Sequence, residues 1–303
     1  MRKAVVDVGS GSVVLLVAES GPDGWHAVVE TSRVTLLGEN LKRTGRIDPA
    51  RAAETLRAVR DAFDIAYEHG VTEAQAVGTA ALRLAQNSTE FLAAANDQAT
   101  PVSVITGELE AHLAYLAVVN DPALRGQQRL TILDPGGQST ELIQASRDSG
   151  DWRKTFSHSF GIGTLQLRTE VLPQETPNPG EILTASSWID DAIGTKVNPG
   201  DVGTLVCLGA PATDLVCIRN RWTTWDAAKV HGETLDYEEV GKAVGWLMRM
   251  SDAEREQVPG VQAGRGSTSH LAALILERFM NALAAPECRV STRGWRWGLL
   301  DQA

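Results

Sequence analysis

Two short segments of the chain share one combination of acidic residue, glycine and serine. The pattern D-x-G-x-x-S occurs at Asp7–Ser12 and again at Asp134–Ser139. Glycine reaches backbone angles that other residues avoid, so a polyanion can approach the main chain closely. Successive N–H groups in such a turn can surround an anion, and serine hydroxyls add further donors. Each segment is therefore predicted to hold a phosphate group.

The aspartate that opens each pattern adds a possible metal ligand. Asp7 and Asp134 are hard oxygen donors, and Mg²⁺ usually binds through one or two carboxylates together with substrate phosphates. The alternative is that each copy marks an ordinary hairpin with an aspartate-initiated turn. Two copies at equivalent points of two similar segments favour the phosphate interpretation.

Apolar runs on both sides of each pattern predict the elements that position it. Ala4–Val6 and Leu130–Leu133 precede the two patterns, and Val13–Ala18 and Thr140–Ile143 follow them. Short apolar or alternating runs broken by glycine predict strand, tight turn and strand. A third apolar strand, Thr204–Leu208, ends at Gly209, where the main chain could again meet a ligand.

A carboxylate and a guanidinium follow two further predicted strands. Thr106 and Gly107 lead into a helix in which Glu110 is on the inward stripe and Glu108 is not, since residues two apart face different ways. A glutamate near a helix N-terminus is expected to stay ionised, as a general base requires. Ordinary helix chemistry is the alternative. Arg83 is interpreted either as a solvated helix residue or as a phosphate clamp.

Length, charge and cysteine content limit the class of protein. The 303 residues suggest two domains, and the net charge of −10 gives no global basic field for nucleic acid or an anionic membrane. We therefore expect neither as a partner. The three cysteines lack metal-ligand spacing and are expected to be buried thiols of a cytoplasmic protein. Asn120–Gln128 is the predicted boundary, which divides the chain into domains 1–124 and 125–303, with a closing helix near 294–303 that packs back on the first.

Motifs along the whole chain resemble one known family. Those that carry the resemblance are DVGSGSVVLLV at Asp7–Val17, VGTAALR at Val77–Arg83, ITGELEAHLAYLAV at Ile105–Val118, DPGGQSTELI at Asp134–Ile143, GTLQLRTEVL at Gly163–Leu172, LGAPATDL at Leu208–Leu215, VHG at Val230–Gly232, ERxxxPG at Glu254–Gly260 and VSTRGWRWGLL at Val290–Leu300. Together they resemble the exopolyphosphatase/guanosine pentaphosphate phosphohydrolase (Ppx/GppA) family.

The resemblance implies both a fold and an activity. The fold is α/β, with two actin-like (ribonuclease H-like, ASKHA) domains and a phosphate-binding cleft between them. The activity is removal of terminal phosphate from inorganic polyphosphate, or of the 5′ γ-phosphate from guanosine pentaphosphate, assisted by Mg²⁺ or Mn²⁺. A homodimer is also implied.

The resemblance also assigns roles to individual residues. Glu110 matches the proposed base that orients the attacking water, Asp134 and Glu141 match carboxylates held near metal and water, and Arg83 matches a basic residue facing the cleft. Asp7, Asp134 and Glu141 are the implied metal ligands. The implied substrate-binding residues are Gly9, Ser10, Gly11, Ser12, Gly136, Gly137, Gln138, Ser139, Thr140 and Gly209.

Several positions depart from the family pattern. Val14 and His112 replace arginines, Gln166 stands at an expected arginine, Pro211 removes a backbone donor, and Asp214 places a carboxylate where a hydroxyl belongs. Losing two or three charge-assisted contacts of roughly 1.5–3 kcal/mol each would weaken affinity or rate by orders of magnitude. The alternative to a hydrolase is therefore a paralogue that binds a phosphorylated ligand as a regulator and turns it over poorly. A kinase or chaperone ATPase of the same fold is less favoured.

Overall fold

The computed structural model describes residues 1–22, 24–148, 150–197 and 202–302. Contacts divide the chain into two compact units. The first contains Met1–Ala114 and the C-terminal segment Trp295–Ala303, and the second contains Tyr115–Gly294. The helix near the C-terminus thus belongs to the same unit as the first D-x-G-x-x-S pattern, Asp7–Ser12.

The first unit is built on a five-stranded mixed sheet with the order β3-β2-β1-β4-β5. Its strands are β1 (Arg2–Val8), β2 (Ser12–Gly21), β3 (Gly24–Val34), β4 (Ala74–Gly78) and β5 (Val102–Val104). The first three pair antiparallel, and β4 and β5 add in parallel to β1. The predicted hairpin around the first pattern is confirmed.

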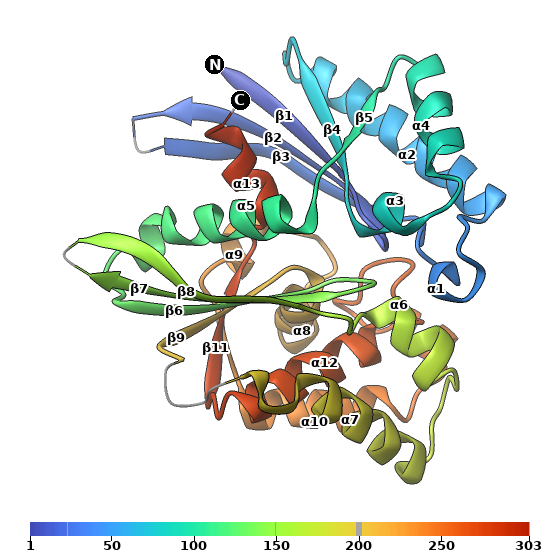
Figure 1. Ribbon diagram of the computed structural model, residues 1–303, viewed down its shortest axis with the longest axis vertical. Helices are drawn as coiled ribbons and strands as arrows, with labels where there is room; N and C mark the ends of the chain where they lie inside the picture. Colours follow the sequence, from blue (N-terminus) through green and yellow to red (C-terminus); the bar gives the residue numbers. More distant parts are fainter. Residues whose placement is uncertain (23, 149, 198–201, 303) are drawn as a thin grey trace. The chain divides into compact units, whose positions relative to one another are not determined.

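The helices of this unit are α1 (Leu41–Thr44), α2 (Pro49–Glu68), α3 (Ala80–Leu84), α4 (Ser88–Asp97), α5 (Gly107–Val119), which continues into the second unit, and α13 (Trp295–Leu300). Of these, α2 packs on one face of the sheet and α13 on the other (Figure 1). Asp48 caps α2 by accepting from the amides of Ala50 and Arg51, as its position before Pro49 predicts. Because side chains alternate along a strand, Ala4, Val6 and Val8 join the core with α2, and Asp7 lies on the opposite face.

The second unit repeats this design with one strand added. Its sheet has the order β10-β11-β9-β6-β7-β8, so the antiparallel set β6–β8 and the parallel strands β9 and β11 occupy the places of β1–β5. The strands are β6 (Arg129–Pro135), β7 (Thr140–Asp148), β8 (Asp151–Phe160), β9 (Thr204–Leu208), β10 (Thr234–Asp236) and β11 (Glu287–Ser291). The second predicted hairpin is therefore also confirmed.

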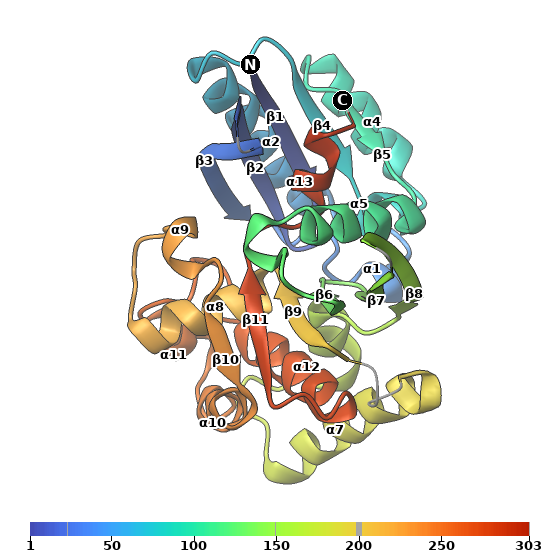
Figure 2. The same cartoon turned by 90° about the vertical axis from the view of Figure 1, so that its left-hand side faces the viewer.

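The core of the second unit lies under one face of its sheet. Leu133 and Leu142 from that face pack with α7, α8, α10 and α12, which Figure 1 shows below β6–β8; in Figure 2, α7 and α10 lie at the bottom of the unit. The helical segments are η1 (Pro122–Leu124), α6 (Thr164–Gln166), the π-helical η2 (Leu167–Val171), α7 (Pro179–Ile193), η3 (Gly194–Lys196), α8 (Ala210–Asn220), α9 (Ala227–Val230), α10 (Tyr237–Leu247), α11 (Asp252–Glu256) and α12 (Ser269–Ala282). Asp134 and Glu141 lie on the face opposite this core.

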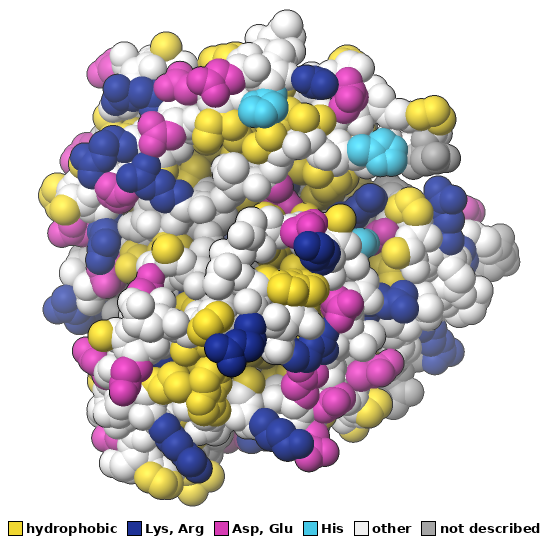
Figure 3. Space-filling model, turned by 180° about the vertical axis from the view of Figure 1, so that it is seen from behind, with side chains coloured by type: hydrophobic (Ala, Val, Ile, Leu, Met, Phe, Trp, Pro, Cys, Tyr) yellow, Lys and Arg dark blue, Asp and Glu magenta, His cyan; other side chains and the backbone are white. Residues whose placement is uncertain are grey.

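Cysteines and surface charge match the expectations from composition. Cys207, Cys217 and Cys288 are all buried and free. Lys and Arg side chains are interspersed with Asp and Glu on the face shown in Figure 3. Because the two signs of charge are mixed there, a polyanion that binds that face must be held by individual donor groups. In the part of the chain that the structure describes, no helix is both long enough and apolar enough to cross a bilayer.

The buried His270 predicts a specific dependence of stability on pH. Its side chain is fully buried in α12, and neither ring nitrogen hydrogen-bonds to a described residue. Burial lowers its pKa to about 2, with help from the charges of Arg255 and Arg168. In the unfolded chain a histidine takes up a proton below a pKa of about 6.5. The unfolded state therefore binds more protons between these two values, and stability falls as the pH falls through this window.

We expect His270→Leu to remove this contribution. Between about pH 7.5 and about pH 5.5, the free energy of unfolding of the wild type should fall by about 1 kcal/mol more than that of the variant. Urea unfolding at both pH values measures the difference, with the exposed His26→Gln as control. Equal pH slopes in wild type and His270→Leu would contradict the prediction.

Candidate functional site

The first loop, Gly9–Ser12, leaves two amides free for a ligand. The Gly9 amide donates to the Ser12 carbonyl at 3.0 Å, which closes the turn. The carbonyls of Ser10 and Gly11 accept amides from the segment 35–38. Within the described residues, the amides of Ser10 and Gly11 donate no hydrogen bond. The loop therefore has fixed carbonyls and two available donors, as an anion site requires.

The second loop, Gly136–Thr140, has the same construction. Its Gly136 amide donates to the Ser139 carbonyl at 2.7 Å, and the carbonyls of Gly136 and Gly137 accept the amides of residues 164 and 165. A side chain at Gly163 would collide with Gly137, so glycine is required there for this close approach. Among the described residues, the amides of Gly137 and Ser139 find no acceptor.

Two predicted ligands of the second loop are buried. Thr140 is fully buried, and its hydroxyl donates to the Ile162 carbonyl at 2.7 Å. This contact fixes the end of the loop, so the substrate-binding role of Thr140 stays a prediction. Gln138 is also buried, with only 4% of its surface exposed.

Parallel pairing brings three functional groups of the first unit to one edge of the sheet. Asp7 lies near the carboxyl end of β1, and β4 and β5 run parallel to that strand. The chain after β4 enters α3, which contains Arg83, and the chain after β5 enters α5, which contains Glu110. The carboxyl ends of parallel strands are where ligands bind in open α/β sheets.

Arg83 and Glu110 form a half-buried ion pair. The Arg83 guanidinium donates from Nη1 to Glu110 Oε2 at 2.8 Å and to the Ile105 carbonyl at 3.0 Å. The two side chains are 24% and 17% exposed, whereas Glu108 is exposed, as the helix pattern predicts. Arg83 is therefore not a solvated helix residue, because its guanidinium is paired with protein acceptors. Its role as a phosphate clamp stays a prediction.

The protonation argument made for Glu110 from sequence needs correction. Burial raises the pKa of Glu110 above its ordinary value, and the charge and hydrogen bond of Arg83 oppose that rise. The sequence argument considered only the helix N-terminus, which favours the ionised form. A pKa raised toward the working pH suits a general base, because the ionised form is then a stronger proton acceptor.

Asp7 is paired with a residue from the far end of the chain. Arg296 of α13 donates from Nη1 to Asp7 Oδ2 at 3.2 Å, and both side chains are 13% exposed. Burial raises the pKa of Asp7 to about 7, with Arg296 lowering it and the Glu110 charge raising it further. Asp7 and Glu110 therefore affect each other electrostatically within the first unit.

The second unit places two carboxylates and a hydroxyl in one row across its sheet. Asp134 pairs with Glu141 on β7, and Glu141 pairs with Ser159 on β8. The Ser159 hydroxyl donates to Glu141 Oε1 at 2.8 Å, and Glu141 is 8% exposed. Gly209 follows β9 next to this row, since a Cβ there would lie 3.5 Å from Asp134 Oδ1. Asp134, Glu141 and Gly209 are thus brought together as predicted.

The donor set fits Mg²⁺ in part. No group of three His, Cys, Asp or Glu side chains suited to a metal occurs among the described residues. Mg²⁺ needs only one or two carboxylates when phosphate and water complete its shell. In the second unit the Asp134–Glu141 pair supplies two, and in the first unit Asp7 Oδ1 is a buried oxygen with no hydrogen bond to the described residues. The carboxylates of each unit, taken by itself, fit this requirement, and the metal itself stays a prediction.

Sequence reasoning missed three contacts of these residues. Arg296 and Ser159 hold Asp7 and Glu141, and Arg265 lies 3.8 Å from the unusual carboxylate of Asp214. Burial raises the pKa of Asp214 to about 6, and Arg265 opposes that rise. One difference between the two patterns is visible in the sequence. The residue seven positions after the aspartate is Glu141 in the second unit and Val14 in the first, so only the second hairpin could place two carboxylates side by side.

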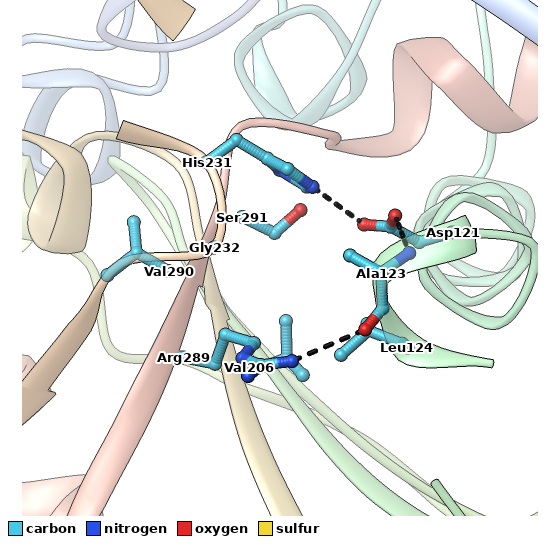
Figure 4. A pocket seen from close by; sticks show the side chains of 9 residues that line it. All are labelled: Asp121, Ala123, Leu124, Val206, His231, Gly232, Arg289, Val290 and Ser291. Atoms are coloured by element: carbon cyan, nitrogen blue, oxygen red, sulfur yellow. Dashed lines mark hydrogen bonds and ion pairs between the residues drawn. The ribbon is translucent and has the colours of Figure 1, made fainter. Parts of the chain in front are cut away.

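A small pocket of the second unit lies away from the predicted residues. It lies where η1 meets β9 and β11, and the His231 ring points across it to Asp121, with Nε2 3.2 Å from Oδ2 (Figure 4). The Asp121 carboxylate also caps η1 through the Ala123 amide, and Arg289 donates to the Ala123 carbonyl at 3.3 Å. These contacts fasten η1 to the sheet, and none of the predicted site residues lines the pocket.

Relatives with established names cover nearly the whole chain. Exopolyphosphatase 2 of Mycobacterium tuberculosis strain H37Rv is 27% identical over an alignment of 295 positions, and the match covers 93% of this chain and 91% of that protein. Exopolyphosphatase 1 of Mycobacterium bovis is 26% identical over an alignment of 306 positions, and the match covers 99% of this chain and 87% of that protein.

Solved structures agree with the fold. The Ppx/GppA family member of Aquifex aeolicus is 29% identical with a TM-score of 0.79, covering all of this chain and 97% of that one. An exopolyphosphatase from Cytophaga hutchinsonii has a TM-score of 0.87 at 21% identity, with the same coverage, and supports the fold alone. The two units have the α/β, actin-like fold predicted from the motifs. The model of the Ppx/GppA phosphatase family matches residues 15–303, so the chain belongs to that family.

Proposed function

We propose that this chain is a hydrolase of phosphoanhydride bonds that releases terminal phosphate from inorganic polyphosphate with the help of Mg²⁺. One observation carries the proposal: the half-buried Glu110 carboxylate is held by Arg83 at the sheet edge that also carries Asp7 and the first loop. The exopolyphosphatases among the relatives support polyphosphate as the substrate.

The residues of both units have distinct tasks in this reaction. Glu110 accepts the proton of the attacking water, whose oxygen forms a bond to the terminal phosphorus. The bond from that phosphorus to the bridging oxygen breaks, and the shortened chain leaves with the electron pair. The free amides of Ser10, Gly11, Gly137 and Ser139 donate to the phosphoryl oxygens, where charge must be stabilised.

Asp134 and Glu141 would hold a metal ion in the second unit, and Asp7 is the predicted metal ligand of the first unit. When bound, Mg²⁺ neutralises charge on the phosphoryl oxygens and orients them. The hydroxyl of Ser159 fixes one oxygen of Glu141.

The test is phosphate release by the purified protein from short and long polyphosphate and from guanosine pentaphosphate. We expect release from polyphosphate that requires added Mg²⁺ or Mn²⁺ and stops with EDTA. p-Nitrophenyl phosphate, a monoester without an anhydride bond, is the control substrate and should react poorly. No release from any anhydride, in either metal, would contradict the proposal. The preference between the two natural substrates and the homodimer stay predictions.

One observation favours a second candidate function. The Asp214 carboxylate is paired with Arg265, so a cation that could meet phosphate is partly compensated by an acid. A regulator that binds polyphosphate without rapid turnover would have this character. Tight binding of tripolyphosphate by calorimetry, with no phosphate released, would favour that function over the hydrolase.

A further inference from the structure

The last helix of the chain contacts the candidate site of the first unit through one side chain. Arg296 donates from Nη1 to Asp7 Oδ2 at 3.2 Å and from Nη2 to Glu30 Oε1 at 3.4 Å. The Asp7 and Glu30 side chains are 13% and 8% exposed. Removing a guanidinium from between two nearly buried carboxylates would leave both without this counter-charge. The contact is therefore specific and hard to replace.

The two oxygens of Asp7 are not equivalent in this arrangement. Arg296 holds Oδ2, whereas Oδ1 is buried and makes no hydrogen bond to the described residues. Oδ1 is the oxygen nearer the first loop, since a Cβ on Gly9 would lie 3.6 Å from it. The Nε donor of Arg296 is also buried and has no hydrogen bond to a described residue. A buried acceptor and a buried donor are thus left for a ligand.

The helix that carries Arg296 is fixed at several points. Gly298 lies so close to the Leu113 carbonyl of α5 that any side chain would collide. Leu113 is one turn after Glu110, so α13 packs against the helix of the predicted base. Near the end of the chain, the Trp25 indole donates to Asp301 Oδ1 at 2.9 Å. Arg296 therefore projects from a support that is itself held by α5 and β3.

We propose that Arg296 is a positioning residue, which holds Oδ2 of Asp7 and leaves Oδ1 as the oxygen offered to a divalent cation at the first loop. This inference rests on the proposed function and names the residue that sets the geometry of its first acidic group. A guanidinium suits this task because its planar fork can bridge two carboxylates at once. Lysine keeps the charge and loses the bridge.

The first experiment is a double-mutant cycle on turnover. We expect Arg296→Gln to lower kcat for phosphate release by about tenfold or more, with Arg296→Lys intermediate. In an Asp7→Asn background, Arg296→Gln should change kcat less than about threefold, since a positioning residue acts through its partner. Additive losses in the cycle would overturn the proposal.

The second experiment does not depend on activity. Free Mn²⁺, measured by electron paramagnetic resonance, gives the metal affinity of each variant. We expect Arg296→Gln to bind Mn²⁺ about threefold or more tightly than wild type, because a positive charge is removed and Oδ2 is released. The same change in the Asp7→Asn background should alter Mn²⁺ affinity less than about twofold. If Arg296→Gln leaves the Mn²⁺ affinity unchanged in the protein that retains Asp7, the proposal is overturned.

Asp301→Ala is the matched control for a structural role of α13. It removes the contact with Trp25 and leaves the Arg296–Asp7 pair in place. We expect it to keep the wild-type kcat and Mn²⁺ affinity, even if the melting temperature falls. If it reproduces the effects of Arg296→Lys, the inference is wrong. If the wild type releases no phosphate, the proposed function is wrong. The Mn²⁺ affinities of Arg296→Gln, with and without Asp7→Asn, would still decide the role of Arg296.

Discussion

The Glu110→Gln variant is expected to release phosphate about 1,000-fold more slowly than wild type, because general base catalysis contributes about 10²–10⁴ in rate. Glutamine keeps the size of the side chain and an oxygen that can accept from Arg83, which now donates to Glu110 at 2.8 Å. It cannot accept a proton from water. Initial rates of phosphate release from a short polyphosphate, at saturating Mg²⁺, measure the loss in kcat.

Glu108→Gln is the matched control for this prediction. It removes a carboxylate from the first turn of the same helix at an exposed position. The rate with this variant should stay within about twofold of wild type, since an exposed dipole contact contributes little. Melting temperatures of both variants exclude loss of fold as the cause. A Glu110→Gln enzyme with wild-type kcat would show that another group activates the water.

Local sequence patterns were enough to predict the elements that carry the site. The strand Thr204–Leu208 occurs with the bounds read from its apolar run, and Asp48 caps α2, as its position before Pro49 predicts. These features depend on neighbours within one turn or one hairpin. The repeated D-x-G-x-x-S pattern predicted two hairpins for the same reason.

Contacts between distant residues could not be read in this way. Arg296 reaches Asp7 across 289 positions of the chain, and no periodicity near either residue indicates the pair. The pairing of Arg83 with Glu110 likewise depends on β4 and β5 lying side by side. The pKa of Glu110 follows from burial, which a helix pattern gives only as a facing direction. Tertiary packing decided each of these outcomes.

The register of the two hairpins explains why the repeated pattern is not a repeated site. Asp7 faces Val14 on β2, whereas Asp134 faces Glu141 on β7. Residues directly opposite on antiparallel strands point to the same side of the sheet. The second unit therefore presents two carboxylates together where the first presents one, and the metal pair is expected in the second unit.

Replacing either member of that pair should affect metal dependence as well as rate. We expect Asp134→Asn and Glu141→Gln each to lower kcat by about 100-fold and to raise the Mg²⁺ concentration for half-maximal rate by about tenfold, the range seen for disturbed metal sites. The double variant should lose little more than either single one, because both residues hold one ion.

Asp151→Asn, which removes an exposed carboxylate at the far end of β8, is the control for charge alone. It should leave the Mg²⁺ dependence unchanged, because its distance and exposure screen it from the site. Rates measured across a Mg²⁺ titration separate the two effects. If Glu141→Gln keeps the wild-type Mg²⁺ dependence while its kcat falls, then Glu141 orients water and does not hold the metal.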